Sequence, residues 1–532
     1  MRKRKATATK QHHKNILFII TDQQRADCLS LLGHPLVKTP NLDRLASQGV
    51  TFTDAFTTAN PCGPSRACID TGRYTHAHRS AHNEVSLPDD ETTMGTYFSK
   101  VGYRAGWIGK SYYVKDYFLH PPEPGHRFVY DYDWYQGPPP GWEDCGFVMC
   151  GSDTPYHAYL KEKGYPEGLV RSGYGCKVIT PEGELMDPGE YRAAQFPTAV
   201  KAEDSETAFF INRTMEFILQ SEAKKVPWIA QVNIFNPHSH FVAPAPYHAM
   251  YDPEKVPINR HPDELKDLHP LHRVYRMERG AMPLDDEKIC RQLRAAYYGM
   301  ITEIDDHVGR LMKFMKEKDL LKNTLIVFTS DHGEFLGDHW CIQKEMWFDE
   351  SIRVPLIVCD PSGEADKTRG RMEDAPVELI DLLPTFMEYA GISIPHHIQG
   401  KSLLPILRGG SVPEGWRTEI YADWDFRFFW SMRELGLRPE QCRMWLVRDK
   451  KFKYVFFNAL PDILYDLTKD PQEFHNVAGN PDYKDVVEEY RKKLLVWRMS
   501  NEDNSRIGWT YGVRPKFGAN PFTFGTPWRL DD

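Results

Sequence analysis

Three segments predicted as strands, far apart in the chain, are each followed at once by polar side chains. They are residues 15–20 followed by Asp22 and Gln23, residues 228–235 followed by Asn236 and His238, and residues 324–329 followed by Asp331 and His332. The first of them is a short apolar run, which is typical of a strand buried on both faces of a parallel sheet. Ligands of such sheets collect beyond the carboxyl ends of the strands. The three polar groups therefore predict one site at that edge of the sheet.

Helical and strand-like segments alternate along most of the chain. Helices are predicted over 41–48 and 92–101, each closed by a following glycine, and further strands over 103–108 and 354–358. This alternation predicts an α/β fold with a mainly parallel central sheet flanked by helices, occupying residues 15–410.

The pattern changes in two places. Residues 120–198 are rich in proline, glycine and aromatic residues, which predicts an irregular insertion; it is either a wall of the site or a loop without a role in it. Beyond Gly409 and Gly410, strands are predicted over 419–424, 444–448 and 453–457, with a helix over 484–497. We expect residues 411–500 to form a smaller α+β subdomain with an antiparallel sheet.

The two ends of the chain differ from the rest. Residues 1–14 are basic and polar, and we expect a disordered tail there. Residues 501–532 carry many aromatic side chains among glycine and proline. So aromatic an arm must be buried, either on its own core or across a subunit interface, and we expect a homo-oligomer.

Charge and hydropathy exclude several classes of protein. The net charge of −8 gives no basic face of the kind that nucleic-acid binding requires. No apolar run reaches the length of a membrane span, and no apolar segment of a secretory signal precedes the first strand. The ten cysteines lack paired spacing, which favours reduced thiols and a cytoplasmic location.

One cysteine lies in a distinctive motif. Cys62-Gly63-Pro64-Ser65-Arg66 is followed by Thr71-Gly72-Arg73. An ordinary buried thiol in a loop bounded by proline would also fit a lone cysteine. A second pattern makes a functional role the better interpretation: Asp22-Gln23 and Asp331-His332-Gly333 could turn oxygen and imidazole ligands toward one divalent cation. Each pair taken alone could equally be a hydrogen-bonded turn.

Together these motifs resemble the type I sulfatases, in the sulfatase branch of the alkaline phosphatase superfamily. Further hallmarks are the segments 39–46, 106–110, 353–356 and 464–473. The resemblance covers nearly the whole chain, and it implies the alkaline-phosphatase-like α/β fold with a smaller C-terminal subdomain. It also implies that Cys62 is oxidised to formylglycine by a formylglycine-generating maturation enzyme. The hydrate of that aldehyde has two hydroxyls: one attacks the ester, and the other then loses its proton to release the product.

The resemblance assigns roles to single residues. Cys62 is the nucleophile and a metal ligand, and Asp22, Gln23, Asp331 and His332 complete the site of one divalent ion, calcium or manganese. Arg66 orients the nucleophile, while Lys110 and Lys344 bind the ester oxygens. His238 protonates the leaving group or binds the ester, with His240 as the alternative. Asn83 and Tyr112 are expected to contact the substrate.

Three residues depart from the family pattern. Gln23 and His332 replace an aspartate and an asparagine that are common in the family, and both replacements resemble the phosphonate monoester hydrolases, a sister group. Asp70 lies where an apolar residue is typical. We therefore expect hydrolysis of small anionic esters: sulfate monoesters, with promiscuity toward phosphonate monoesters and phosphodiesters, or phosphonate monoesters as the main activity. A non-catalytic binding subunit with unconverted Cys62 is the third hypothesis.

Overall fold

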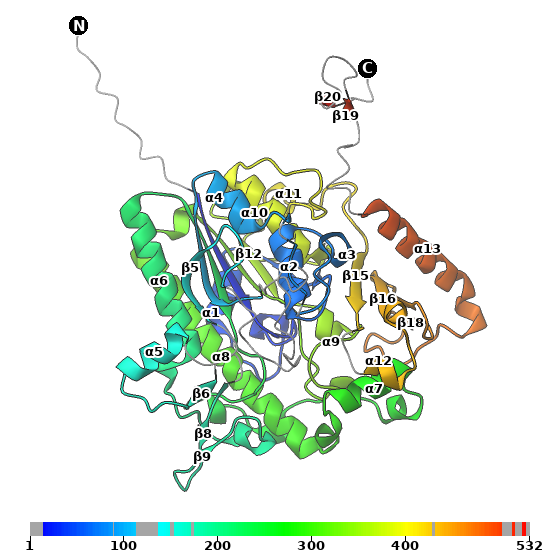
Figure 1. Cartoon of the computed structure of the whole chain (residues 1–532), viewed down its shortest axis with the longest axis horizontal. Helices are drawn as coiled ribbons and strands as arrows, with labels where there is room; N and C mark the ends of the chain where they lie inside the picture. Colours follow the sequence, from blue (N-terminus) through cyan, green and yellow to red (C-terminus); the bar gives the residue numbers. More distant parts are fainter. Residues whose placement is uncertain are drawn as a thin grey trace, which may run out of the picture.

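The computed structural model describes residues 14–83, 85–88, 90–112, 137–148, 154–171, 175–427, 431–502, 513–515 and 524–527. An eight-stranded sheet crosses the centre of this part of the chain, with the strand order β13-β2-β12-β11-β1-β10-β4-β5 (Figure 1). Its strands are β1 (Asn15–Thr21), β2 (Val50–Phe52), β4 (Arg104–Lys110), β5 (Glu143–Val148), β10 (Trp228–Ile234), β11 (Thr324–Ser330), β12 (Leu356–Cys359) and β13 (Arg371–Glu373).

The central sheet is mainly parallel, as the sequence predicts. Only β12 pairs antiparallel with its neighbours β11 and β2, and every other pairing in the sheet is parallel. The predicted α/β fold class is therefore confirmed.

Strand β1 shows why the sheet is buried on both faces. Its alternate residues Ile16, Phe18 and Ile20 pack in one hydrophobic cluster, whereas Leu17 and Ile19 pack in another. Successive side chains of a strand point to opposite faces, so a strand between two helical layers needs apolar residues at every position.

Two sets of helices form these layers. The side of Leu17 and Ile19 is covered by α1 (Pro40–Ala46), α5 (Pro155–Glu162), α6 (Glu206–Lys224) and α8 (Glu287–Glu317). The opposite side is covered by α2 (Cys62–Thr71), α4 (Met94–Lys100), α10 (Leu382–Ala390) and α11 (Leu404–Gly409). Shorter or peripheral helices are α3 (Thr75–His78), α7 (Pro270–Glu278), α9 (Asp349–Ile352) and α12 (Ser431–Glu434).

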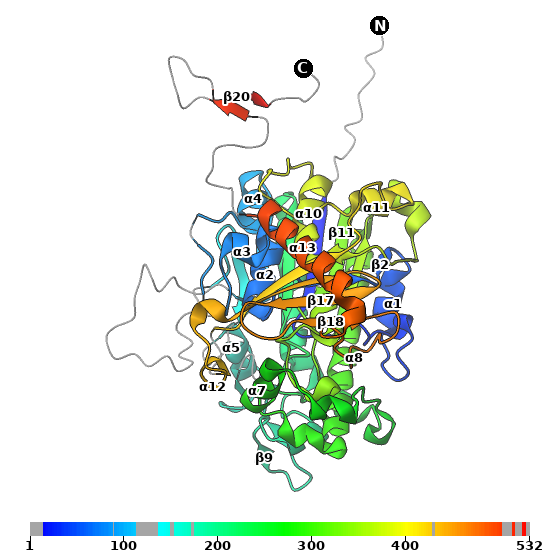
Figure 2. The ribbon, with the colours of Figure 1, turned by 90° about the vertical axis from the view of Figure 1, so that its right-hand side faces the viewer.

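The C-terminal part contains the predicted antiparallel sheet. Its strands, in spatial order, are β15 (Ile420–Asp425), β16 (Arg443–Arg448), β17 (Phe452–Phe457) and β18 (Ile463–Asp466). The last of these had not been predicted as a strand. Helix α13 (Lys484–Ser500) lies across the sheet, where Tyr490, Leu494 and Trp497 are buried (Figure 2).

The described part of the insertion over 120–198 is more regular than predicted. Strand β5 pairs in parallel with β4 and forms an edge of the central sheet. Its sequence, Glu-Asp-Cys-Gly-Phe-Val, begins with polar residues because an edge strand needs no apolar side chains on both faces. The remaining short strands among the described residues are β3 (Ala55–Phe56), β6 (Val170–Arg171), β7 (Gly175–Cys176), β8 (Val178–Ile179), β9 (Leu185–Met186), β14 (Val377–Glu378), β19 (Val513–Pro515) and β20 (Phe524–Pro527).

Little of the two ends of the chain is described. The basic tail and most of the aromatic arm lie outside the described residues, so their packing and the homo-oligomer stay predictions. Within the described ranges, no helix combines the length and the apolar character that a membrane span requires. The nine cysteines of these ranges are all free thiols.

Candidate active site

The carboxyl ends of β10, β1 and β11 meet at one edge of the central sheet. β1 lies between the other two strands and pairs in parallel with both, so that Thr21 lies beside Ile234 on one side and Ser330 on the other. The residues that follow the three strands are therefore neighbours in space.

Four buried side chains converge at this edge: Asp22, Cys62, Asp331 and His332. Their potential ligand atoms all lie within 4.8 Å of one another. Nε2 of His332 is 3.2 Å from Sγ of Cys62 and 3.4 Å from Oδ1 of Asp331. Oδ1 of Asp22 is 3.7 Å from the same sulfur. These are four of the five predicted metal ligands.

The donor set fits one divalent cation. Nδ1 of His332 donates to the backbone carbonyl of Gly333, at 3.0 Å, which turns Nε2 toward the cluster. A histidine that binds a metal usually donates its other ring nitrogen in this way. Two carboxylates with one imidazole suit manganese as well as calcium.

The surroundings of the two carboxylates shift their pKa values in opposite directions. Burial raises the pKa of Asp331, and the neighbouring Asp22 carboxylate raises it further. Burial would also raise the pKa of Asp22, but Lys110 and other nearby cations hold it well below its usual range. A cation placed between the two carboxylates would relieve their mutual repulsion.

Three cationic side chains surround the cluster. Lys110, at the end of β4, forms an ion pair with Asp22. Nε of Arg66, on α2, donates to Asp331 at 2.8 Å, and Nη1 donates to Oδ1 of Asn233 at 2.8 Å. The ammonium of Lys344 donates to Oε1 of Gln23 at 2.6 Å. Positive charge therefore faces the cluster from several elements.

Cys62 is the first residue of α2 and is only 3% exposed. Burial alone would raise the pKa of its thiol, but Lys110, Lys344 and His332 outweigh burial and the Asp22 carboxylate, and lower the pKa well below its ordinary value. This environment stabilises negative charge on the side chain at position 62.

Asn83 lies beside the first turn of α2. Its Oδ1 accepts the backbone N–H of Gly63 at 2.7 Å, so it supports the segment that carries Cys62. A Cβ atom at Gly63 would lie 2.9 Å from that oxygen, which explains the need for glycine. A direct contact of Asn83 with substrate stays a prediction.

His238 follows β10 and reaches the same site. Its Nε2 is 2.8 Å from the ammonium of Lys344. Burial lowers the pKa of the imidazole, and the charge of Lys344 lowers it further, so the ring is neutral near pH 7.

The structure places Tyr112 beside Asp70, and its contact with substrate stays a prediction. Its hydroxyl donates to Oδ2 of Asp70 at 3.0 Å, and its ring packs in the core behind α2. Nε1 of Trp142 donates to the other oxygen of Asp70. Asp70, the unusual residue of the motif, is therefore accommodated by two buried donors.

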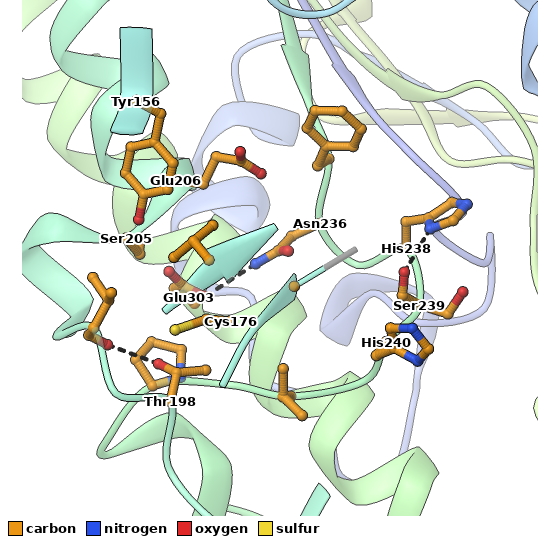
Figure 3. Close-up of a pocket in the computed structure, with 16 residues that line it drawn as sticks. Tyr156, Cys176, Thr198, Ser205, Glu206, Asn236, His238, Ser239, His240 and Glu303 are labelled. Carbon is orange, nitrogen blue, oxygen red and sulfur yellow. Dashed lines mark hydrogen bonds between the residues drawn. The ribbon is translucent and has the colours of Figure 1, made fainter. Parts of the chain in front are cut away.

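His240 lines a pocket of about 60 Å³ together with His238 (Figure 3). Tyr156, Cys176 and Thr198 from the insertion line the same pocket, which places part of the insertion beside the loop that carries His238. Asn236 points into this pocket and donates to Glu303 at 3.2 Å.

Two residues of the site had no predicted role. Asn233 accepts from Arg66, and its only sequence signal is that it is one of two polar residues, with Gln231, in a mainly apolar strand. Glu334 accepts from the side chain of Gln23. It follows Asp331-His332-Gly333 directly, which is the signal that could have identified it.

Two family models match the chain. The model described as "Sulfatase" matches residues 14–392, and the model "N-sulphoglucosamine sulphohydrolase, C-terminal" matches residues 337–500. The first of these spans more than half of the chain and includes the whole cluster.

Curated relatives cover nearly the full length. The chain is 36% identical over 519 residues to the multifunctional alkaline phosphatase superfamily protein PehA of Trinickia caryophylli, covering 92% of this chain and 96% of that protein. It is 28% identical over 510 residues to an arylsulfatase of Clostridium perfringens, covering 94% and 96%.

Solved structures show the same architecture. The phosphonate monoester hydrolase of Agrobacterium radiobacter matches with a TM-score of 0.82 and 32% identity, covering 95% of this chain and 98% of that one. The phosphonate monoester hydrolase of Silicibacter pomeroyi matches with a TM-score of 0.84 and 30% identity at the same coverage.

Proposed function

Because the chain belongs to the sulfatase family and is a hydrolase of sulfuric or phosphonate esters, we propose that it uses Cys62, converted to formylglycine, with one divalent cation to hydrolyse singly charged esters. The observation that carries this proposal is the buried cluster of Asp22, Cys62, Asp331 and His332. The converging charges of Lys110, Arg66 and Lys344 support it, because they can bind an anionic ester.

We rank phosphonate monoesters first among the substrates, with sulfate monoesters as the second activity. Gln23 and His332 favour this order, and so does the likeness to two phosphonate monoester hydrolases at 32% and 30% identity. The arylsulfatase of Clostridium perfringens, at 28% identity, supports the second activity. Phosphonate and sulfate monoesters each carry one negative charge, so one anionic site can stabilise both transition states.

The three cationic side chains of the site differ in their partners. Lys344 is buried, and within the described ranges no carboxylate lies at ion-pair distance from it; its ammonium contacts Gln23 and His238 instead. Its charge is therefore available to an ester oxygen. Lys110 is paired with Asp22 and Arg66 with Asp331, so these two hold the carboxylates in place as well as facing the ester.

Two groups would complete the site. A bound divalent cation would lower the pKa of the attacking hydroxyl and neutralise charge on the ester oxygens. Formylglycine at position 62 would supply that hydroxyl, and the local field fits it, because the same field lowers the pKa of the Cys62 thiol.

The experiment is a paired comparison of substrates. The chain would be expressed with a formylglycine-generating enzyme, and kcat/KM measured for an aryl phosphonate monoester and an aryl sulfate with the same leaving group, each with Ca²⁺ and with Mn²⁺. A higher value for the phosphonate supports the proposed order, and a higher value for the sulfate would reverse it. No turnover of either ester by fully converted protein would overturn the proposal and favour a non-catalytic binding role.

A further inference from the structure

The side chain of Gln23 is held at both of its ends. Its Nε2 donates to Oε2 of Glu334, and its Oε1 accepts from the ammonium of Lys344 at 2.6 Å. All three side chains are buried. A carboxamide has one donor end and one acceptor end, so its orientation depends on which partner lies at each end.

The backbone of Gln23 is held as well. Its φ of 72° lies in the left-handed region, which is uncommon for a residue with a side chain. Its N–H donates to Oδ1 of Asp331 at 3.1 Å, and its carbonyl accepts from the hydroxyl of Tyr297 at 2.7 Å. A conformation of this kind persists only where surrounding contacts enforce it, and such positions cluster at functional sites.

The other carboxylate oxygen of Glu334 also accepts hydrogen bonds. Its Oε1 accepts two backbone N–H groups, from Leu336 at 2.8 Å and from Gln343 at 2.7 Å. Only Oε2 is left to face Gln23. The carboxylate is thus fixed by the loop that follows His332, and it presents an acceptor to the amide.

We propose that Glu334 is a positioning residue that turns the carboxamide oxygen of Gln23 toward Lys344 and the cation site. Both oxygens of Glu334 accept from N–H groups and the ammonium of Lys344 only donates, so one orientation of the amide satisfies both partners. The opposite orientation would direct an NH₂ group at Lys344 and at the cation. This inference rests on the proposed function, because it assumes a cation beside Asp22 and Asp331.

The same logic predicts what one substitution does. In Glu334→Gln, the oxygen of the new side-chain amide still accepts the hydrogen bonds from the backbone N–H groups of Leu336 and Gln343. The NH₂ group of the new amide then faces the NH₂ group of Gln23. Two donors cannot pair, so Gln23 rotates and turns its own NH₂ group toward Lys344. The double variant Gln23→Glu/Glu334→Gln restores the pairing, because the carboxylate at position 23 accepts from the new amide and from Lys344.

The experiment measures Mn²⁺ binding to the full-length chain, by electron paramagnetic resonance of free Mn²⁺, in preparations matched for conversion of Cys62. We expect the Kd of Glu334→Gln to rise about tenfold or more, the size of effect that partners of metal ligands usually have. The double variant should return to within about threefold of the wild type. Glu345→Gln is the matched control, since Glu345 is a buried carboxylate of the same segment that pairs with Arg279.

The outcomes separate the two proposals. Unchanged Mn²⁺ affinity in Glu334→Gln, or a double variant that binds no better than Glu334→Gln, would overturn the role of Glu334 alone. A loss in Glu345→Gln as large as that in Glu334→Gln would also overturn it, by showing a general effect of removing a buried carboxylate. The proposed cation site would be overturned, and the inference with it, if the wild-type chain bound no Mn²⁺ or if Asp22→Asn did not weaken the binding.

Discussion

The imidazole of His238 accepts a hydrogen bond from Lys344. Nε2 of the ring lies 2.8 Å from the ammonium, and Nδ1 lies 2.7 Å from the backbone carbonyl of Ser239. An ammonium only donates and a carbonyl only accepts, so the neutral ring carries its proton on Nδ1. His238 therefore orients Lys344 in this state, and Lys344 is the better placed of the two to offset charge on the leaving oxygen.

A pair of substitutions tests this division of roles. We expect Lys344→Met to lower kcat/KM by about 10²–10³, the usual effect of removing one group that stabilises transition-state charge. His238→Gln keeps an acceptor for Lys344 and should lose less. The measurement is kcat/KM for aryl phosphonate monoesters with good and poor leaving groups. A loss in His238→Gln that exceeds that of Lys344→Met, and grows as the leaving group becomes poorer, would make His238 the proton donor instead.

Asp70 predicts a pH dependence of stability. Burial raises the pKa of this carboxyl to about 7, against hydrogen bonds from Tyr112 and Trp142 that lower it. Because the folded-state pKa is above the unfolded value of about 3.9, the stabilising contribution is complete below about pH 4 and is lost as the pH rises through 7.

Substitution of Asp70 should remove this dependence. The wild-type chain should lose up to about 1.4 kcal/mol per pH unit relative to Asp70→Asn between pH 4 and 7. Thermal unfolding midpoints at pH 5, 6 and 7 measure the difference, with the exposed Glu203→Gln as control. A gap between wild type and Asp70→Asn that stays constant over this range would contradict the assignment.

Lys453 joins the C-terminal sheet to the catalytic part of the chain. This fully buried ammonium, on β17, lies 2.5 Å from Oδ1 of Asp349, forms an ion pair with Glu473 and donates to the carbonyl of Trp347. Removing one partner of a buried ion pair costs about 3–5 kcal/mol, because the remaining charges lose their compensation.

We therefore expect Lys453→Met to lower the thermal unfolding midpoint strongly. Its matched control is Lys450→Met, because Lys450 forms an exposed ion pair with Asp374 that should contribute about 0–1 kcal/mol. Equal midpoints for the two variants would show that the buried cluster does not hold the two parts together.

The sequence predicts the centre of the fold better than its margins. Strand β1 could be recognised because every residue from Ile16 to Ile20 is buried and apolar. Strand β5 lies at the edge of the sheet and carries polar residues, so no apolar run identifies it. The direction of β12 depends on how the chain crosses the sheet, which its own residues do not record.

The same limit applies to the site. Asp22 and His332 could be predicted because each follows a strand end that had to lie at the same edge. The packing of Tyr112 against Asp70 could not, because it depends on how α2 lies against the segment after β4. The role of Glu334 depends on a contact across 311 residues of sequence, which only the folded chain shows.

The central claim is that turnover depends on Cys62 converted to formylglycine. The most direct test is to prepare the protein with graded amounts of formylglycine-generating enzyme and to measure two quantities in each preparation. They are the converted fraction of residue 62, by peptide mass spectrometry, and kcat for an aryl phosphonate monoester. The account predicts activity proportional to the converted fraction, with none in Cys62→Ala. Full activity in protein whose Cys62 remains a thiol would contradict it.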